Sequence, residues 1–212
     1  MPLQNRVTPL GDLIATPERG LVFGNRGCLH NERGVIRRQY ATKRWIACRL
    51  QFRVRKRPQL MAPGRYTELF FLDEATALAA GHRPCAECRR PDYDRFTAFW
   101  SELHPGQNRA DPIDAQLHSE RTGTGRFHQV PFSQLPDGVF VMHDGEPHVI
   151  VGQWLLAWSP GGYLEPRRRP ANDHATVITP PSLVALVAGG WSPLVPLLHP
   201  TAHRASPGRR PR

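Results

Sequence analysis

Two cysteines, Cys85 and Cys88, lie two residues apart in the segment GHRPCAECRRPD. A Cys-x-x-Cys pair on a tight turn presents both sulfurs to one point and is typical of a tetrahedral zinc site, in which Zn–S distances are about 2.3 Å. The alternative is a redox pair of the thioredoxin type, whose motif begins a helix directly after a strand. Here the pair follows a helix-like run and a turn, so the sequence favours zinc.

Such a pair supplies half of a tetrahedral site, and the chain has only two further cysteines, too few for a disulfide scaffold. Cys48 is the leading candidate for a third ligand, because it lies in a strand-like segment with a suitable face. Cys28 and His30 are the candidates for the fourth position. The predicted metal ligands are therefore Cys48, Cys85, Cys88 and either Cys28 or His30.

Positive charge gathers in the same part of the chain. The formal net charge is +10, and residues 26–57 contain eleven Lys or Arg but a single acid, Glu32. Such a field attracts phosphates and steers an anionic polymer toward the protein. A general arginine bias of the genome is the competing explanation, since only two of the 28 basic residues are lysines. The predicted partner is nucleic acid, DNA rather than RNA, and the predicted contacts are Arg49, Arg53, Arg55, Lys56, Arg57, Arg89 and Arg90.

A strand predicted over residues 45–54 would position Cys48. Residues two apart on a strand face the same way. Cys48 and Leu50 therefore fall on the apolar face, while Arg49 and Arg53 fall on the opposite face.

The Cys-x-x-Cys turn is placed by the elements on either side of it. A strand over 67–72 leads to Asp73, which is suited to cap a helix over 74–80. A second helix is predicted over 93–103, with its aromatic side chains on one core-facing side. Further along the chain, the patterns predict a short helix at 112–121, strands at 139–143, 148–151, 154–158 and 176–178, and a final helix ending at Val187.

These elements predict an α+β protein with two small mixed units. The first, over 1–104, is stabilised by zinc and carries the basic strands. The second spans 105–200, and the basic segment 201–212 is predicted to be a disordered tail. No apolar run approaches the roughly 18 residues that a membrane span requires. The N-terminus has no signal pattern, so we expect a cytoplasmic protein.

The segment ELFFLDEATALAAGHRPCAECRRPD, residues 68–92, resembles the latter half of the Ada-type zinc domain of bacterial methyl-phosphotriester DNA repair proteins. WIACRLQF, residues 45–52, is similar to the strand that carries that family's first two metal cysteines. The resemblance covers about residues 45–92.

The resemblance implies roles for three cysteines. Cys85 and Cys88 match the last two zinc ligands of the family, and Cys48 matches the cysteine that accepts a methyl group from DNA phosphate. The second cysteine of that earlier pair is replaced here by Phe52. We therefore expect Cys48 to be a metal ligand rather than a methyl acceptor.

Three functions are compatible with these patterns. The first is a zinc-containing, nucleic-acid-binding protein with a role in DNA repair or stress. The second is an enzyme, a nuclease or a hydrolase of modified nucleotides or DNA, with a site between the two units that uses Asp114, His118 or His30. Asp114 and His118 are four residues apart and would share one helix face. The third is a metal-stabilised protein-interaction module.

Overall fold

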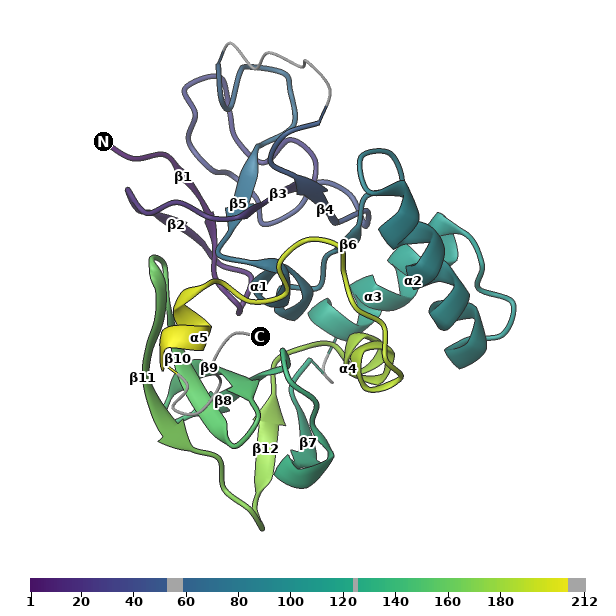
Figure 1. The fold of residues 1–212 in the computed structure, drawn as a ribbon. Helices are drawn as coiled ribbons and strands as arrows, with labels where there is room; N and C mark the ends of the chain where they lie inside the picture. The colour runs from purple at the N-terminus through teal and green to yellow at the C-terminus, as the bar shows by residue number, and fades with distance from the viewer. Residues whose placement is uncertain (53–58, 124–125, 206–212) are drawn as a thin grey trace.

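The computed structural model describes residues 1–52, 59–123 and 126–205. It contains two six-stranded sheets and several helices, which confirms the α+β class (Figure 1). The first sheet is mixed, with the strand order β2-β1-β5-β3-β4-β6. Its strands are β1 (Gln4–Val7), β2 (Leu13–Ala15), β3 (Val22–Asn25), β4 (Ile46–Arg49), β5 (Leu69–Phe71) and β6 (Arg83–Pro84).

The second sheet is antiparallel, in the order β11-β10-β9-β8-β12-β7. A tight turn at Asp144 and Gly145, both with positive φ, joins β8 to β9, as two-residue hairpins require. The sequence did not reveal β7 or β11, which lie at the two edges. The strands of the second sheet are β7 (His128–Pro131), β8 (Phe140–His143), β9 (Glu146–Val151), β10 (Trp154–Ser159), β11 (Gly162–Arg168) and β12 (His174–Val177).

Four of the five α-helices within the described residues fall where the sequence predicted them: α1 (Glu74–Ala79), α2 (Arg90–Leu103), α3 (Ala110–Thr122) and α4 (Pro181–Ala188). The fifth, α5 (Thr201–Ala205), corrects the predicted disordered tail. Its Ala202 is fully buried against the core, so residues 201–205 are part of the folded unit. The rest of the predicted tail lies outside the described residues.

Helix α1 lies between the two sheets and joins them (Figure 1). Leu72, Ala75 and Ala79 pack against Phe140 and other side chains of the second sheet. Helices α2, α3 and α4 share another core, built on the predicted aromatic face of α2. The boundary predicted at residue 104 therefore separates the sheets but does not divide the core.

Asp73 ties α1 to two distant segments. One carboxylate oxygen caps the helix by accepting from the Thr76 backbone N–H at 2.8 Å. The other oxygen accepts from the Tyr163 hydroxyl at 2.7 Å and from the His199 backbone N–H at 2.8 Å. Burial raises the pKa of this carboxyl, and the hydrogen bonds oppose that effect. The cap is thus also a link between the N-terminal and C-terminal halves.

We expect Tyr163→Phe to lower the free energy of unfolding by about 1–3 kcal/mol, because a buried carboxylate loses one of its donors. Urea denaturation measures this. Tyr66→Phe is the matched control: Tyr66 is exposed, and its loss should change stability by no more than about 0.5 kcal/mol. Equal effects of the two substitutions would contradict this role of Asp73.

A candidate metal centre of three cysteines

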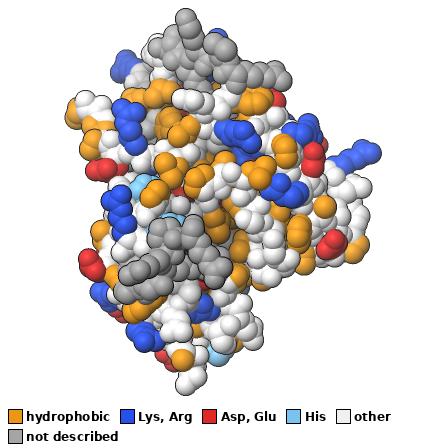
Figure 2. Space-filling model, in the orientation of Figure 1, with side chains coloured by type: hydrophobic (Ala, Val, Ile, Leu, Met, Phe, Trp, Pro, Cys, Tyr) orange, Lys and Arg blue, Asp and Glu red, His pale blue; other side chains and the backbone are white. Residues whose placement is uncertain are grey.

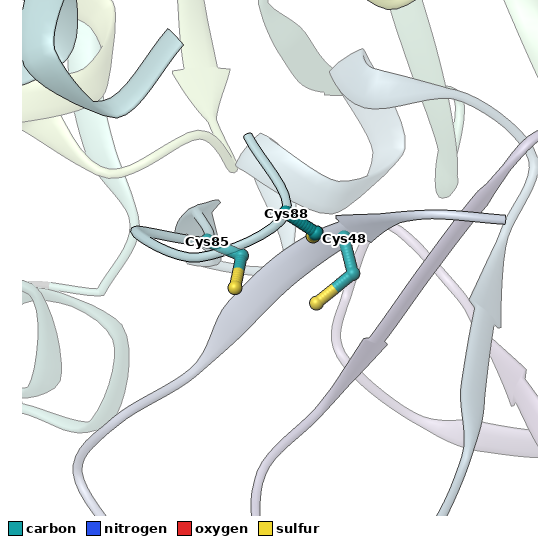
Figure 3. A group of neighbouring side chains, drawn as sticks. All are labelled: Cys48, Cys85 and Cys88. Carbon is teal, nitrogen blue, oxygen red and sulfur yellow. The ribbon is translucent and has the colours of Figure 1, made fainter. Parts of the chain in front are cut away.

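Three cysteines converge where β4 meets the turn after β6 (Figure 3). β4 and β6 pair in parallel, with Ala47 opposite Pro84. The Cys85 backbone N–H then donates to the Ala47 carbonyl at 2.9 Å, which fixes the turn beside Cys48. The sulfurs of Cys48, Cys85 and Cys88 all lie within 4.8 Å of one another. Four thiolates around zinc would be about 3.8 Å apart at the usual Zn–S distance, so this spacing suits a metal ion.

The surroundings of the cluster are apolar. Phe23 packs against Cys48 and Cys85, each of which is 7% exposed. Hydrogen bonds from the Cys48 and Cys88 thiols lower the pKa of Cys85. The hydrogen bonds of Cys48 to Cys85 and Cys88, together with burial, raise the pKa of Cys48. Protons are thus shared among thiols that cannot all ionise together. A bound cation would replace these protons, because the thiolate is the form that binds metal.

Neither predicted fourth ligand joins the cluster. The Cys28 sulfur lies 3.5 Å from the carbonyl oxygen of His30. The His30 ring is hydrogen-bonded to Thr67, with 2.6 Å between its Nδ1 and the Thr67 hydroxyl. No further His, Cys, Asp or Glu among the described residues belongs to the group, and residues 53–58, 124–125 and 206–212 contain none of these types. The protein therefore supplies three of these ligands, and a tetrahedral ion would keep one position for solvent or another molecule.

The strand that carries Cys48 is shorter than predicted. β4 ends at Arg49, because its partner β3 begins at Val22, directly opposite. Leu50 is 40% exposed instead of facing the core. Cys48 nevertheless points into the cluster as expected, while Ala47 faces the main core on the other side.

The predicted nucleic-acid contacts have different environments. Arg49 and Arg90 are exposed, and Arg90 lies 3.6 Å from Asp94 and over the ring of Tyr93. Arg89 is a correction: it is fully buried and paired with Glu74 and Asp92, so its guanidinium is not accessible to a phosphate. The other four predicted contacts, Arg53, Arg55, Lys56 and Arg57, lie outside the described residues.

Other basic side chains of the same charge run are exposed. Arg33, Arg37, Arg38 and Lys43 precede β4, and among the described residues none of them lies within ion-pair distance of a carboxylate. These four residues belong to the basic segment 26–57, but the predicted nucleic-acid contacts did not include them. Figure 2 shows Lys and Arg side chains spread over one face of the molecule. On that face the basic side chains are therefore dispersed, with acidic and hydrophobic side chains between them.

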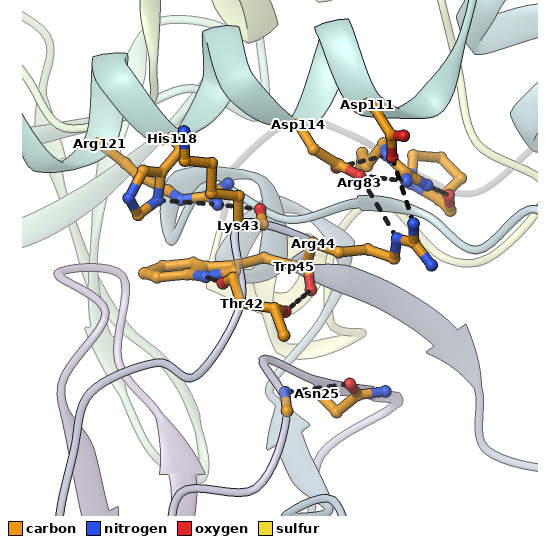
Figure 4. A network of polar contacts seen from close by, with 12 residues as sticks. Asn25, Thr42, Lys43, Arg44, Trp45, Arg83, Asp111, Asp114, His118 and Arg121 are labelled. Atoms are coloured by element: carbon orange, nitrogen blue, oxygen red, sulfur yellow. Dashed lines mark hydrogen bonds and ion pairs between the residues drawn. The ribbon is translucent and has the colours of Figure 1, made fainter.

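Asp114 and His118 have different hydrogen-bond partners (Figure 4). Asp114 accepts two hydrogen bonds from the buried Arg83, at 2.8 and 2.7 Å, and this ion pair fastens α3 to β6. The His118 ring contacts Arg121 at 3.4 Å instead. The two side chains named in the enzyme hypothesis thus make separate structural contacts.

Comparison with protein families, curated proteins and solved structures found no match. The resemblance to the Ada-type zinc domain therefore stays a prediction. Among the described residues, no helix is both long and apolar enough to cross a lipid bilayer. What the structure establishes is an α+β fold with a three-cysteine cluster that can hold a metal ion.

Proposed function

We propose that this protein binds zinc through Cys48, Cys85 and Cys88 and binds nucleic acid through the exposed basic residues of the segment that leads into and ends β4. The observation that carries the proposal is the convergence of three cysteines from two separate segments. Soft thiolate ligands favour Zn²⁺ over Mg²⁺ or Ca²⁺, which prefer oxygen. The zinc would link β4 to the turn before α2 and would act as a Lewis acid toward whatever occupies its remaining position.

The basic surface supports a nucleic acid as the partner. Arg37, Arg38, Lys43 and Arg49 are all exposed in the segment that leads into and ends β4. Exposed cations that contact the phosphates of a nucleic acid displace its condensed counterions, and this release drives sequence-independent binding. DNA is the preferred polymer, and a role in DNA repair or stress follows from the Ada-type resemblance. The buried position of Cys48, which is 7% exposed, supports its assignment as a ligand rather than a methyl acceptor.

We expect the double variant Arg37→Ala/Arg38→Ala to bind duplex DNA more weakly and with a smaller dependence on salt. Each lost phosphate contact reduces the slope of log K against log salt concentration by about 0.9, so losing two reduces it by about 1.8. Fluorescence anisotropy at several salt concentrations gives both quantities, and zinc content should stay unchanged.

The matched control is Arg168→Ala/Arg204→Ala. These two arginines are exposed in the second half of the chain, and their removal lowers the net charge by the same amount. If both double variants change the slope equally, binding depends on total charge and not on the surface near β4. If neither changes it, the proposed nucleic-acid function is wrong.

A further inference from the structure

Two buried arginines, far apart in the sequence, lie against the same tryptophan. Arg26 is 1% exposed and Arg121 is 6% exposed. Their guanidinium carbons lie 4.0 and 3.8 Å from the centre of the Trp45 ring. Figure 4 shows Arg121 reaching from α3 toward this ring. Such stacking fixes the position of each guanidinium group but does not neutralise its charge.

The hydrogen bonds of these arginines leave donors unused. Arg26 donates through Nε to the His82 ring at 3.2 Å and through Nη1 to the Gly11 carbonyl at 2.8 Å, whereas its Nη2 is buried and has no hydrogen-bond partner among the described residues. Arg121 donates through both terminal nitrogens to backbone carbonyls, and its buried Nε has no partner within the described part of the chain. Buried donors almost always have acceptors, so two unmatched arginine donors indicate a missing acceptor.

Both arginines line one cavity of about 340 Å³ between the first sheet and the second half of the protein. Arg126 lines it too, and its Nη2 and that of Arg26 both lie within 4 Å of the position a Cβ at Gly11 would occupy. Leu10, Ala79 and Ile178 supply apolar wall, and Tyr40 also lines the cavity. A volume of this size is in the range of small-molecule sites.

The charge of the cavity is strongly positive. Among the described residues, no carboxylate lies within 4.0 Å of the three guanidinium groups, and Asp12 is the only acid that lines the cavity. Burial, with repulsion from neighbouring arginines, lowers the pKa of Arg26 and of Arg121 to about 9, so both stay protonated at neutral pH. Burial also lowers the pKa of His82, which stays neutral. Three cations and one carboxylate leave two positive charges.

We propose that this cavity binds a phosphate monoester, with Arg26, Arg121 and Arg126 as its donors. A dianionic phosphate would balance the two positive charges, and its oxygens would accept from the guanidinium groups of the arginines that line the cavity. Arginine forms short, strong, often paired hydrogen bonds to phosphate oxygens. The apolar wall and Tyr40 would contact the group that carries the phosphate. This site is built from different residues than the cysteine cluster and does not rest on the proposed function.

A phosphate monoester has two sources here, a free nucleotide or the 5′ end of a nucleic-acid strand. Isothermal titration calorimetry of the full chain compares adenosine 5′-monophosphate with adenosine, and a 5′-phosphorylated oligonucleotide with its 5′-hydroxyl counterpart. We expect each phosphorylated probe that enters the cavity to have at least about tenfold higher affinity than its unphosphorylated partner. A preference within the mononucleotide pair alone identifies a small ligand, whereas a preference within the oligonucleotide pair identifies a strand end.

Arg126→Gln tests the donors without emptying the core, because Arg126 is only half-buried. We expect it to weaken phosphate binding by about tenfold, since one charge-assisted hydrogen bond is lost. Arg109→Gln is the matched control, because Arg109 is exposed and does not line the cavity, and it should bind like the unmodified protein. Arg26→Lys, which keeps the charge but loses the fork of donors, should weaken binding similarly if it folds.

No phosphate preference in either pair of probes would overturn the proposal, as would equal binding by the Arg126 and Arg109 variants. These outcomes are separate from the nucleic-acid proposal. The Arg37→Ala/Arg38→Ala variant leaves the cavity intact, so it should keep its preference for phosphate even where its DNA affinity falls.

Discussion

Cys85→Ser should abolish metal binding and destabilise the first sheet. The unmodified protein should hold about one zinc per chain, measured by atomic emission after dialysis. A ligand that binds only the folded state at a free concentration 1,000 times its Kd stabilises that state by about 4 kcal/mol, and this contribution should be lost. Removing the zinc with a chelator should lower the stability of the unmodified protein to about the same level.

Cys28→Ser provides a matched control, because it removes a thiol that lies outside the cluster. A serine hydroxyl can still reach the His30 carbonyl that now lies 3.5 Å from the sulfur. Zinc content and stability should therefore change little. If Cys28→Ser loses zinc as completely as Cys85→Ser, a fourth thiolate does bind the ion. If the protein holds no metal and Cys85 and Cys88 form a reversible disulfide, the redox interpretation replaces zinc.

The sequence predicted features that depend on neighbours along the chain. Asp73 at the start of α1 and the Cys-x-x-Cys turn are local patterns, and the structure places both as expected. Cys48 lies in one cluster with Cys85 and Cys88, as its predicted strand position indicated; its role as a metal ligand stays a prediction. The extent of that strand was not predictable, since β4 ends where its partner β3 begins.

The arginine cavity could not be predicted for the same reason. Arg26, Trp45 and Arg121 belong to three separate segments, and no local spacing connects them. Only the packing of α3 against the first sheet brings them together. Arg89 is the opposite case, a residue whose predicted exposure was wrong. In the sequence it is one more cation in a basic segment that we expected to be exposed. Its burial depends on Glu74, which lies 15 residues earlier in the chain.

Replacing Arg89 by methionine should lower the free energy of unfolding by about 3–5 kcal/mol at pH 7, because two buried carboxylates lose their counter-charge. Arg89 donates to both oxygens of Glu74, at 2.8 and 2.7 Å, and to Asp92 at 2.8 Å. All three side chains are fully buried. Asp92 keeps a contact with Arg95, so Glu74 is the group left without a cation.

The loss of stability caused by Arg89→Met should increase with pH. Burial already raises the pKa of Glu74, and Arg89 is the main influence that opposes the rise. Without Arg89 the folded-state pKa of Glu74 should rise further above its unfolded value, so the folded state takes up a proton more readily. A carboxyl with a raised folded pKa destabilises the protein as pH increases. The Arg89→Met variant should thus be closest to the unmodified protein near pH 5 and furthest from it near pH 8.

Arg90→Met is the control for this experiment, because Arg90 is the next residue in the chain and its side chain is 61% exposed. Its contact with Asp94, at 3.6 Å, is of the kind that contributes at most about 1 kcal/mol, and its removal should show little dependence on pH. Urea denaturation of both variants at pH 5, 7 and 8 decides the matter. Similar losses for the two variants, or a loss for Arg89→Met that does not change with pH, would show that Arg89 is not the counter-charge that permits Glu74 to be buried.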